Sequence, residues 1–162
     1  MRRSLTLATA LLATVTASSA LSAEYAEAVL TLDSRIVSQT HGEQDAAALY
    51  EAGSIGKFAC TIATLRLADR GMLSLDDTVG SLLPQFAESV IGPITLRQVM
   101  ASRSGIADGL MPAFRSDPRS VMATPDATTA IERFATGPLA FDPGTQWSYD
   151  LVNWIVVQAV LE

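Results

Sequence analysis

The chain carries a serine and its single lysine three residues apart, as Ser54-Ile55-Gly56-Lys57. Residues i and i+3 share one face of a helix, so the lysine ammonium can reach the serine hydroxyl. A serine becomes an effective nucleophile beside a base, and a desolvated lysine can act as that base. Arginine could not do so, because a guanidinium keeps its proton at working pH. The spacing therefore indicates nucleophilic catalysis, and a surface lysine on an ordinary helix is the alternative.

Two other motifs overlap the same segment and fit it less well. A phosphate-binding loop needs glycine at 51 and serine or threonine at 58, where the chain has Glu51 and Phe58. A nucleophile elbow needs glycine at 52, where Ala52 stands, and an apolar strand before it. Its base would have to be His41, which is the only histidine. Neither motif explains the segment as well as the serine–lysine pair.

A helix over residues 54–70 is predicted to position this pair. Gly71 stands where a C-terminal cap is expected, and Arg66 and Arg70 occupy the last turns, where positive charge is favourable. The apolar residues at helical spacing, which predict the buried face, are Ile55, Phe58, Ala59, Ile62, Ala63 and Leu65.

The rest of the chain reads mostly as helix and loop. The pattern predicts a short helix over 24–32, a strand over 34–40 and a polar turn over 41–47. Asp76 and Asp77 can cap a short helix that ends before Pro84.

Further helices are expected toward the C-terminus. Thr95 can cap one through Met100, Asp126 can open one through residue 134, and an apolar one runs from residue 150 onward. Residues 106–125, with three prolines, are expected to be irregular, and Pro143-Gly144 predicts a turn.

Composition limits the function classes. The 162 residues, 49% of them hydrophobic and 17% charged, suit one ordinary domain. A net charge of −6 offers no basic surface for a phosphate backbone, so we do not expect nucleic acid as a partner. Cys60 is the only cysteine and cannot form an internal disulfide. A lone histidine makes no metal site, and neither a metal nor another cofactor is expected.

The N-terminus has the three parts of a secretory signal peptide. Arg2 and Arg3 precede an apolar run over residues 5–15, and small residues fill 18–23. A spanning helix needs about twenty apolar residues, so a stable membrane span is not expected, although an uncleaved anchor is the alternative. Residues 1–23 are therefore predicted to be a signal peptide, with cleavage after Ala20 or Ala23. The mature protein would be periplasmic or extracellular.

Three blocks, in the same order, resemble one protein family. Gly53-Ser54-Ile55-Gly56-Lys57-Phe58 is similar to the active-site helix of the serine β-lactamase and D,D-peptidase (penicillin-binding protein-like) superfamily. The branch in question holds class C β-lactamases, D-alanyl-D-alanine carboxypeptidases and related esterases. Its "ITLRHLLTHTSGL" and "F-x-P-G-T-x-W-x-Y" stretches resemble residues 94–106, ITLRQVMASRSGI, and 141–149, FDPGTQWSY.

The resemblance implies roles for individual residues. Ser54 would be the acylated nucleophile, Lys57 its hydrogen-bonded partner, and Tyr149 the proton shuttle that begins a Y-x-N motif. Whether Lys57 or Tyr149 is the formal base stays open. The asparagine of Y-x-N would fall at 151, where the chain has Leu151, and Asn153 is the candidate to replace it in substrate binding.

The resemblance also implies the fold. The expected class is α+β, a β-lactamase/transpeptidase-like fold represented mostly by its helical region with an incomplete antiparallel sheet. Residues 24–162 would be the N-terminal part of the domain, because no K-T-G or H-T-G triad follows Tyr149. In the family that strand supplies a backbone N–H to the oxyanion hole.

The function expected on this basis is that of an exported serine hydrolase. It would form an acyl-enzyme with a small molecule or peptide that carries an amide or ester. A β-lactam, a D-alanyl peptide and a simple ester remain alternatives as substrate. A truncated remnant that is not catalytic, or a binding protein, is the alternative function.

Overall fold

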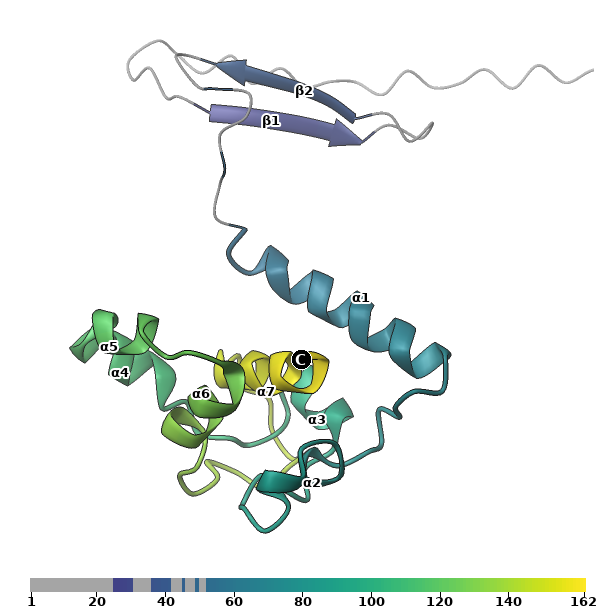
Figure 1. The fold of residues 1–162 in the computed structure, drawn as a ribbon, viewed down its shortest axis with the longest axis vertical. Coiled ribbons are helices and arrows are strands. Elements are labelled where there is room, and N and C mark those ends of the chain that lie inside the picture. The colour runs from purple at the N-terminus through teal and green to yellow at the C-terminus, as the bar shows by residue number, and fades with distance from the viewer. Residues whose placement is uncertain (1–24, 31–35, 42–44, 46–48, 50–51) are drawn as a thin grey trace, which may run out of the picture. The chain divides into compact units, whose positions relative to one another are not determined.

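The computed structural model describes residues 25–30, 36–41, 45, 49 and 52–162. The chain divides into two units, Met1–Glu51 and Ala52–Glu162. The predicted signal peptide and most of the predicted turn over 41–47 lie outside the described residues. Figure 1 shows the elements in chain order.

The first unit contains an antiparallel pair of strands, β1 (Tyr25–Leu30) and β2 (Ile36–His41), with Tyr25 opposite His41 and Leu30 opposite Ile36. The predicted strand over 34–40 is therefore confirmed. The predicted helix over 24–32 is wrong. Alanine, glutamate and leucine have high intrinsic helix propensities. These propensities are small in energy, and pairing with a neighbouring strand that contains β-branched residues overrides them.

The second unit begins with α1 (Ile55–Asp69), which confirms the predicted helix. Gly71 has a φ of +67°, its N–H donates to Ala68 O, and the N–H of Met72 donates to Leu67 O. These two bonds form the Schellman motif that the glycine predicted.

The predicted apolar face of α1 is not buried by the described residues. Ile55, Phe58, Ile62 and Leu65 are all exposed. The side that contacts helix α7 (Val152–Leu161) carries the fully buried Thr64, with Cys60 one turn earlier packed against the core. Lys57 lies on this same side, because it precedes Cys60 and Thr64 by three and seven positions.

Short helices follow α1. They are α2 (Val79–Leu82), a 3-10 turn η1 (Pro84–Phe86) and α3 (Leu96–Met100). Thr78 caps α2, not Asp76 or Asp77 as the sequence suggested. Asp77 instead accepts from the N–H of Ser74, and Asp76 pairs with Arg97 at 2.8 Å. The predicted cap at Thr95 is confirmed, as part of a capping box with Gln98.

The stretch predicted to be irregular contains two helices, α4 (Leu110–Ser116) and α5 (Pro118–Met122). Pro112 and Pro118 fall in the first turns of these helices, where proline costs no hydrogen bond, so they do not interrupt them. The predicted helix α6 (Ala127–Phe134) is capped by Asp126, whose side chain accepts from the N–H of Thr129.

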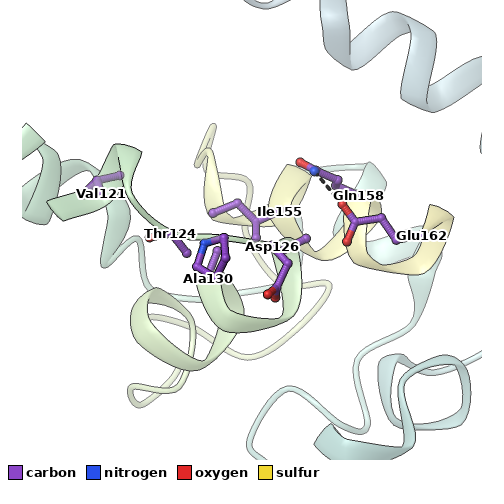
Figure 2. A pocket seen from close by; sticks show the side chains of 9 residues that line it. Val121, Thr124, Asp126, Ala130, Ile155, Gln158 and Glu162 are labelled. Atoms are coloured by element: carbon purple, nitrogen blue, oxygen red, sulfur yellow. Dashed lines mark hydrogen bonds between the residues drawn. The ribbon is translucent and has the colours of Figure 1, made fainter. Parts of the chain in front are cut away.

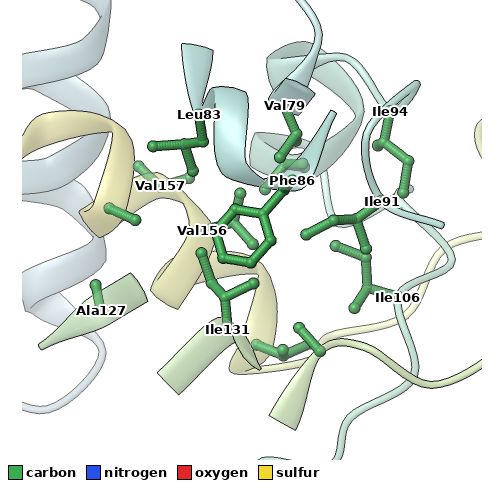
Figure 3. Packing of buried hydrophobic residues seen from close by; sticks show 14 of the residues in the cluster. Val79, Leu83, Phe86, Ile91, Ile94, Ile106, Ala127, Ile131, Val156 and Val157 are labelled. Carbon is green, nitrogen blue, oxygen red and sulfur yellow. The ribbon is translucent and has the colours of Figure 1, made fainter. Parts of the chain in front are cut away.

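Helix α7 is central to the second unit, because α1, α3 and α6 all contact it. Figure 3 shows Val156 and Val157 of α7 packed with side chains from the other elements around them. The members of this apolar cluster that are at most 1% exposed are Val79, Ile91, Ile94, Leu96, Val99, Ile131, Ala135, Val152, Val156 and Val157. Among the described residues, no helix is long and apolar enough to cross a bilayer.

Candidate active site

Three of the four predicted site residues meet at one oxygen atom. The ammonium Nζ of Lys57 donates to the Oγ of Ser54 at 3.1 Å, and the Tyr149 hydroxyl donates to the same oxygen at 3.0 Å. Lys57 Nζ also lies 5.2 Å from the centre of the Tyr149 ring. The structure thus brings together a nucleophile candidate, a cation and a phenol that are distant in sequence.

Helix α1 places the serine and the lysine. Ser54 is the N-cap residue, but its side chain does not cap the helix. A serine at this position usually accepts from a backbone N–H of the first turn. Here the Ser54 oxygen accepts from Lys57 and Tyr149 instead, so both are bonded to the atom that would attack a substrate.

The turn that follows α3 helps to place Tyr149. Ser102 has a left-handed φ of +56° and lies just after the C-cap residue of α3. The N–H of Ser102 donates to Val99 O and that of Arg103 to Gln98 O, which completes a Schellman motif without glycine. The carbonyl of Ser102 then accepts from the N–H of Ser148 at 3.0 Å.

The same turn, residues 102–105, holds the segment that leads to Tyr149. The N–H of Gly144 donates to Arg103 O at 2.8 Å, and the Arg103 guanidinium donates to the carbonyl of Gly144. The N–H of Ala140 donates to Gly105 O at 2.7 Å. Gly144 has a φ of +87°, as expected for the predicted Pro143-Gly144 turn. Backbone pairing between two segments some forty residues apart in sequence therefore fixes the approach to Tyr149.

The surroundings of Tyr149 favour its deprotonated form. The hydrogen bond with Ser54, and then the Lys57 ammonium, lower the pKa of the Tyr149 phenol from its ordinary value of 10.0, and desolvation opposes this. A nearby positive charge and a hydrogen bond both stabilise a phenolate. Once deprotonated, Tyr149 could accept the proton of the Ser54 hydroxyl while Lys57 remains a charged donor.

Trp147, to which no role was assigned from the sequence, lies beside the site. Its ring stacks on Tyr149 with centroids 6.4 Å apart and planes 25° apart. Both rings are exposed, Trp147 by 66% and Tyr149 by 52%. An exposed aromatic surface next to a nucleophile is suited to an apolar group on a substrate. The position of Trp147 two residues before the candidate proton shuttle Tyr149 was the sequence feature that could have indicated its place beside the site.

The fourth predicted residue, Asn153, lies in a different setting. It is 1% exposed, its Oδ1 accepts from Ser104 Oγ at 2.5 Å, and its Nδ2 donates to the carbonyl of Asp150 at 3.4 Å. No hydrogen bond of the described residues joins it to Ser54, Lys57 or Tyr149. Leu151, at the family's asparagine position, is the N-cap residue of α7. Substrate binding by Asn153 remains a prediction.

A separate shallow cavity of about 240 Å³ opens between α5, α6 and α7 (Figure 2). Gln158 and Glu162 line it and are hydrogen-bonded to each other at 2.8 Å. None of Ser54, Lys57 and Tyr149 lines it. Within the described part of the chain, no three histidine, cysteine or acidic side chains are grouped as metal ligands.

Known proteins resemble this chain in sequence. The sequence profile of the Beta-lactamase family matches residues 21–162. The chain is 29% identical to the lovastatin esterase of Penicillium rubens over 114 aligned residues. This alignment covers 59% of this chain and 29% of the esterase. The chain is also 30% identical to the esterase EstB of Burkholderia gladioli over 114 aligned residues. That alignment covers 64% of this chain and 29% of EstB.

Solved structures give the same result for the fold. A D-stereospecific amidohydrolase from Streptomyces superposes with a TM-score of 0.68 at 26% identity, over 85% of this chain and 43% of the amidohydrolase. This likeness supports the β-lactamase/transpeptidase-like fold, of which the described residues are mostly helical. The full sheet of that fold remains a prediction. The chain spans about three tenths of the length of the two esterases.

Proposed function

The chain belongs to the beta-lactamase family, and on that premise we propose that it carries the nucleophile of an exported serine hydrolase. Ser54 would attack the carbonyl carbon of an amide or ester and form an acyl-enzyme. The single observation that carries this proposal is the convergence of Lys57 and Tyr149 on Ser54 Oγ, at 3.1 and 3.0 Å. The kinship with two esterases and an amidohydrolase supports the reaction class.

In the proposed acylation step, Tyr149 is the base and Lys57 the fixed cation. The Tyr149 phenolate takes the proton from Ser54 Oγ as that oxygen bonds to the substrate carbonyl carbon. The phenol then returns the proton to the leaving nitrogen or oxygen as its bond to carbon breaks. Lys57 stabilises the phenolate because it lies 5.2 Å from the ring and donates to Ser54.

Deacylation would repeat the cycle with water in place of Ser54. Tyr149, again as phenolate, would take a proton from water while the water oxygen attacks the acyl carbonyl carbon. Ser54 then leaves and regains its proton from Tyr149. Water can reach the site because Ser54 is exposed to solvent and Tyr149 is 52% exposed.

An ester with a good leaving group is the sharpest probe of this proposal, because its departure needs no proton. We expect the purified full chain to release nitrophenolate from p-nitrophenyl acetate in a burst that matches the enzyme concentration. A fluorescent penicillin and a D-alanyl-D-alanine peptide, tested in parallel, distinguish the substrate classes. If a cooperatively folded chain is acylated by none of the three, the non-catalytic alternative is favoured and the hydrolase proposal is overturned.

Export is proposed from the N-terminal pattern alone. When the chain is expressed in a secreting bacterial host, N-terminal sequencing of the recovered protein should begin at Leu21 or Glu24. A protein that is recovered with Met1 from the cytoplasm would contradict the predicted signal peptide. A protein recovered with Met1 from the membrane fraction would indicate an uncleaved anchor.

A further inference from the structure

Two polar side chains are buried together in the core of the second unit. Ser104 and Asn153 are each 1% exposed, and the serine Oγ donates to the asparagine Oδ1 at 2.5 Å. The same Oγ accepts from the N–H of Ile106 at 3.1 Å. Burying polar groups costs free energy that apolar side chains of similar shape would not cost. The pair therefore calls for an explanation beyond packing.

The pair is connected to the chain on both sides of Tyr149. The Asn153 Nδ2 donates to the carbonyl of Asp150, the residue that follows Tyr149. The residue before it, Ser148, donates its N–H to the carbonyl of Ser102, two positions before Ser104. The hydrogen bond between Ser104 and Asn153 joins these two attachments, so both flanks of Tyr149 are tied to the turn at residues 102–105.

Tyr149 depends on its backbone for its position. Its ring is 52% exposed and stacks on Trp147, which is itself 66% exposed. A half-exposed ring is held in place by fewer packing contacts than a buried one. The Tyr149 hydroxyl must nevertheless stay within hydrogen-bond distance of Ser54, which is 95 residues away in sequence. Rigid attachment of the two flanking residues would supply that precision.

We propose that Ser104 and Asn153 are positioning residues, which hold the backbone around Tyr149 so that its hydroxyl stays on Ser54 Oγ. Asn153 then acts through Tyr149 and not by contact with substrate. The effect on catalysis rests on the proposed function. The effect on the geometry and ionisation of Tyr149 does not, and can be measured without a substrate.

The measurement is an ultraviolet titration of tyrosinate, with the Tyr149→Phe titration subtracted to remove Tyr25 and Tyr50. In the wild type we expect the Tyr149 midpoint to lie below 10.0, because Ser54 and Lys57 stabilise the phenolate. In Ser104→Ala and in Asn153→Ala we expect the midpoint to rise toward 10.0. A wild-type midpoint at the ordinary value, or unchanged midpoints in both variants, overturns the inference.

A paired replacement guards against simple unfolding. Ser104→Ala combined with Asn153→Leu fills the same space with apolar groups, which costs less stability than removing one partner of the pair, although the N–H of Ile106 loses its acceptor. It still removes the tie to Asp150, so its midpoint should rise as well. Two controls should titrate like the wild type. Ser89→Ala removes a partly buried hydroxyl bonded to Phe86 O, and Ile131→Val trims the core.

Acylation by p-nitrophenyl acetate separates this inference from the proposed function. We expect the two single variants to slow acylation about tenfold or more, with KM unchanged. If the wild type is not acylated but the midpoint still moves in the variants, the proposed function fails and the positioning inference stands. If the wild type is acylated and the midpoint does not move, the inference fails and the proposed function stands.

Discussion

The Tyr149 hydroxyl donates a hydrogen bond to Ser54 Oγ at 3.0 Å, across 95 residues of sequence. Ser54 is the N-cap residue of helix α1, and Tyr149 lies in the segment before α7. Lys57, which donates to the same oxygen, makes this a three-residue site.

Tyr149→Phe removes the hydroxyl and keeps the ring that stacks on Trp147. Because the missing group would be the general base, we expect acylation by p-nitrophenyl acetate to slow by about 10² to 10⁴. The melting temperature should stay near that of the wild type, since the hydroxyl lies on an exposed residue. Stopped-flow burst rates provide the measurement. An unchanged rate would show that Tyr149 is not the base.

The pH dependence of acylation should report the lowered pKa of Tyr149. The active form is the phenolate, whose population grows as pH rises, so the rate should increase with pH to a plateau with a midpoint below 10.0. Lys57→Met removes a cation that stabilises the phenolate, so the midpoint should move to higher pH. Lys57→Arg keeps the charge and should move it less. A midpoint that falls in Lys57→Met would contradict this assignment.

Gly105→Ala should destabilise the turn at residues 102–105. Gly105 has a φ of +76°, and a Cβ there would overlap the carbonyl oxygen of Phe141. The expected loss is about 2 kcal/mol or more in the free energy of unfolding. The matched control is Gly137→Ala, where a Cβ would meet no atom within 4 Å. Urea denaturation compares them, and equal midpoints would argue against the close approach to Phe141.

Ser102→Gly should act in the opposite direction. Ser102 holds a left-handed φ of +56°, which costs a residue with a Cβ about 1 to 2 kcal/mol. Glycine removes that cost but adds entropy to the unfolded chain, so a net gain of about 0.5 kcal/mol is expected. Ala101→Gly, one position earlier at an ordinary φ of −80°, should lose stability instead. Two changes of the same sign would refute this account of the turn.

Local sequence signals sufficed for several elements and for most of the candidate site. The caps at Thr95 and Asp126 and the glycine at 71 predicted helix ends because capping depends on residues close in sequence. Ser54 and Lys57 were found because helical spacing alone puts them together. Tyr149 needed the family resemblance, since no local rule joins it to Ser54.

The features that the sequence did not predict correctly have physical causes. In β1, residues 25–30, helix-forming side chains were overridden by pairing with β2. In α4 and α5, prolines read as breakers occupy first turns, where they are tolerated. The bond between Ser104 and Asn153 joins residues 49 positions apart and is set by tertiary packing, so the sequence pattern did not predict it.

The proposed reaction depends most directly on Ser54 as the nucleophile. The full chain is treated with a fluorescent fluorophosphonate, and the adduct is mapped by mass spectrometry after proteolysis, with Ser54→Ala as the comparison and circular dichroism as the folding control. We predict one adduct per chain, on Ser54, and none in Ser54→Ala. A folded wild-type chain that takes no label, or that is labelled equally in Ser54→Ala, would contradict the account.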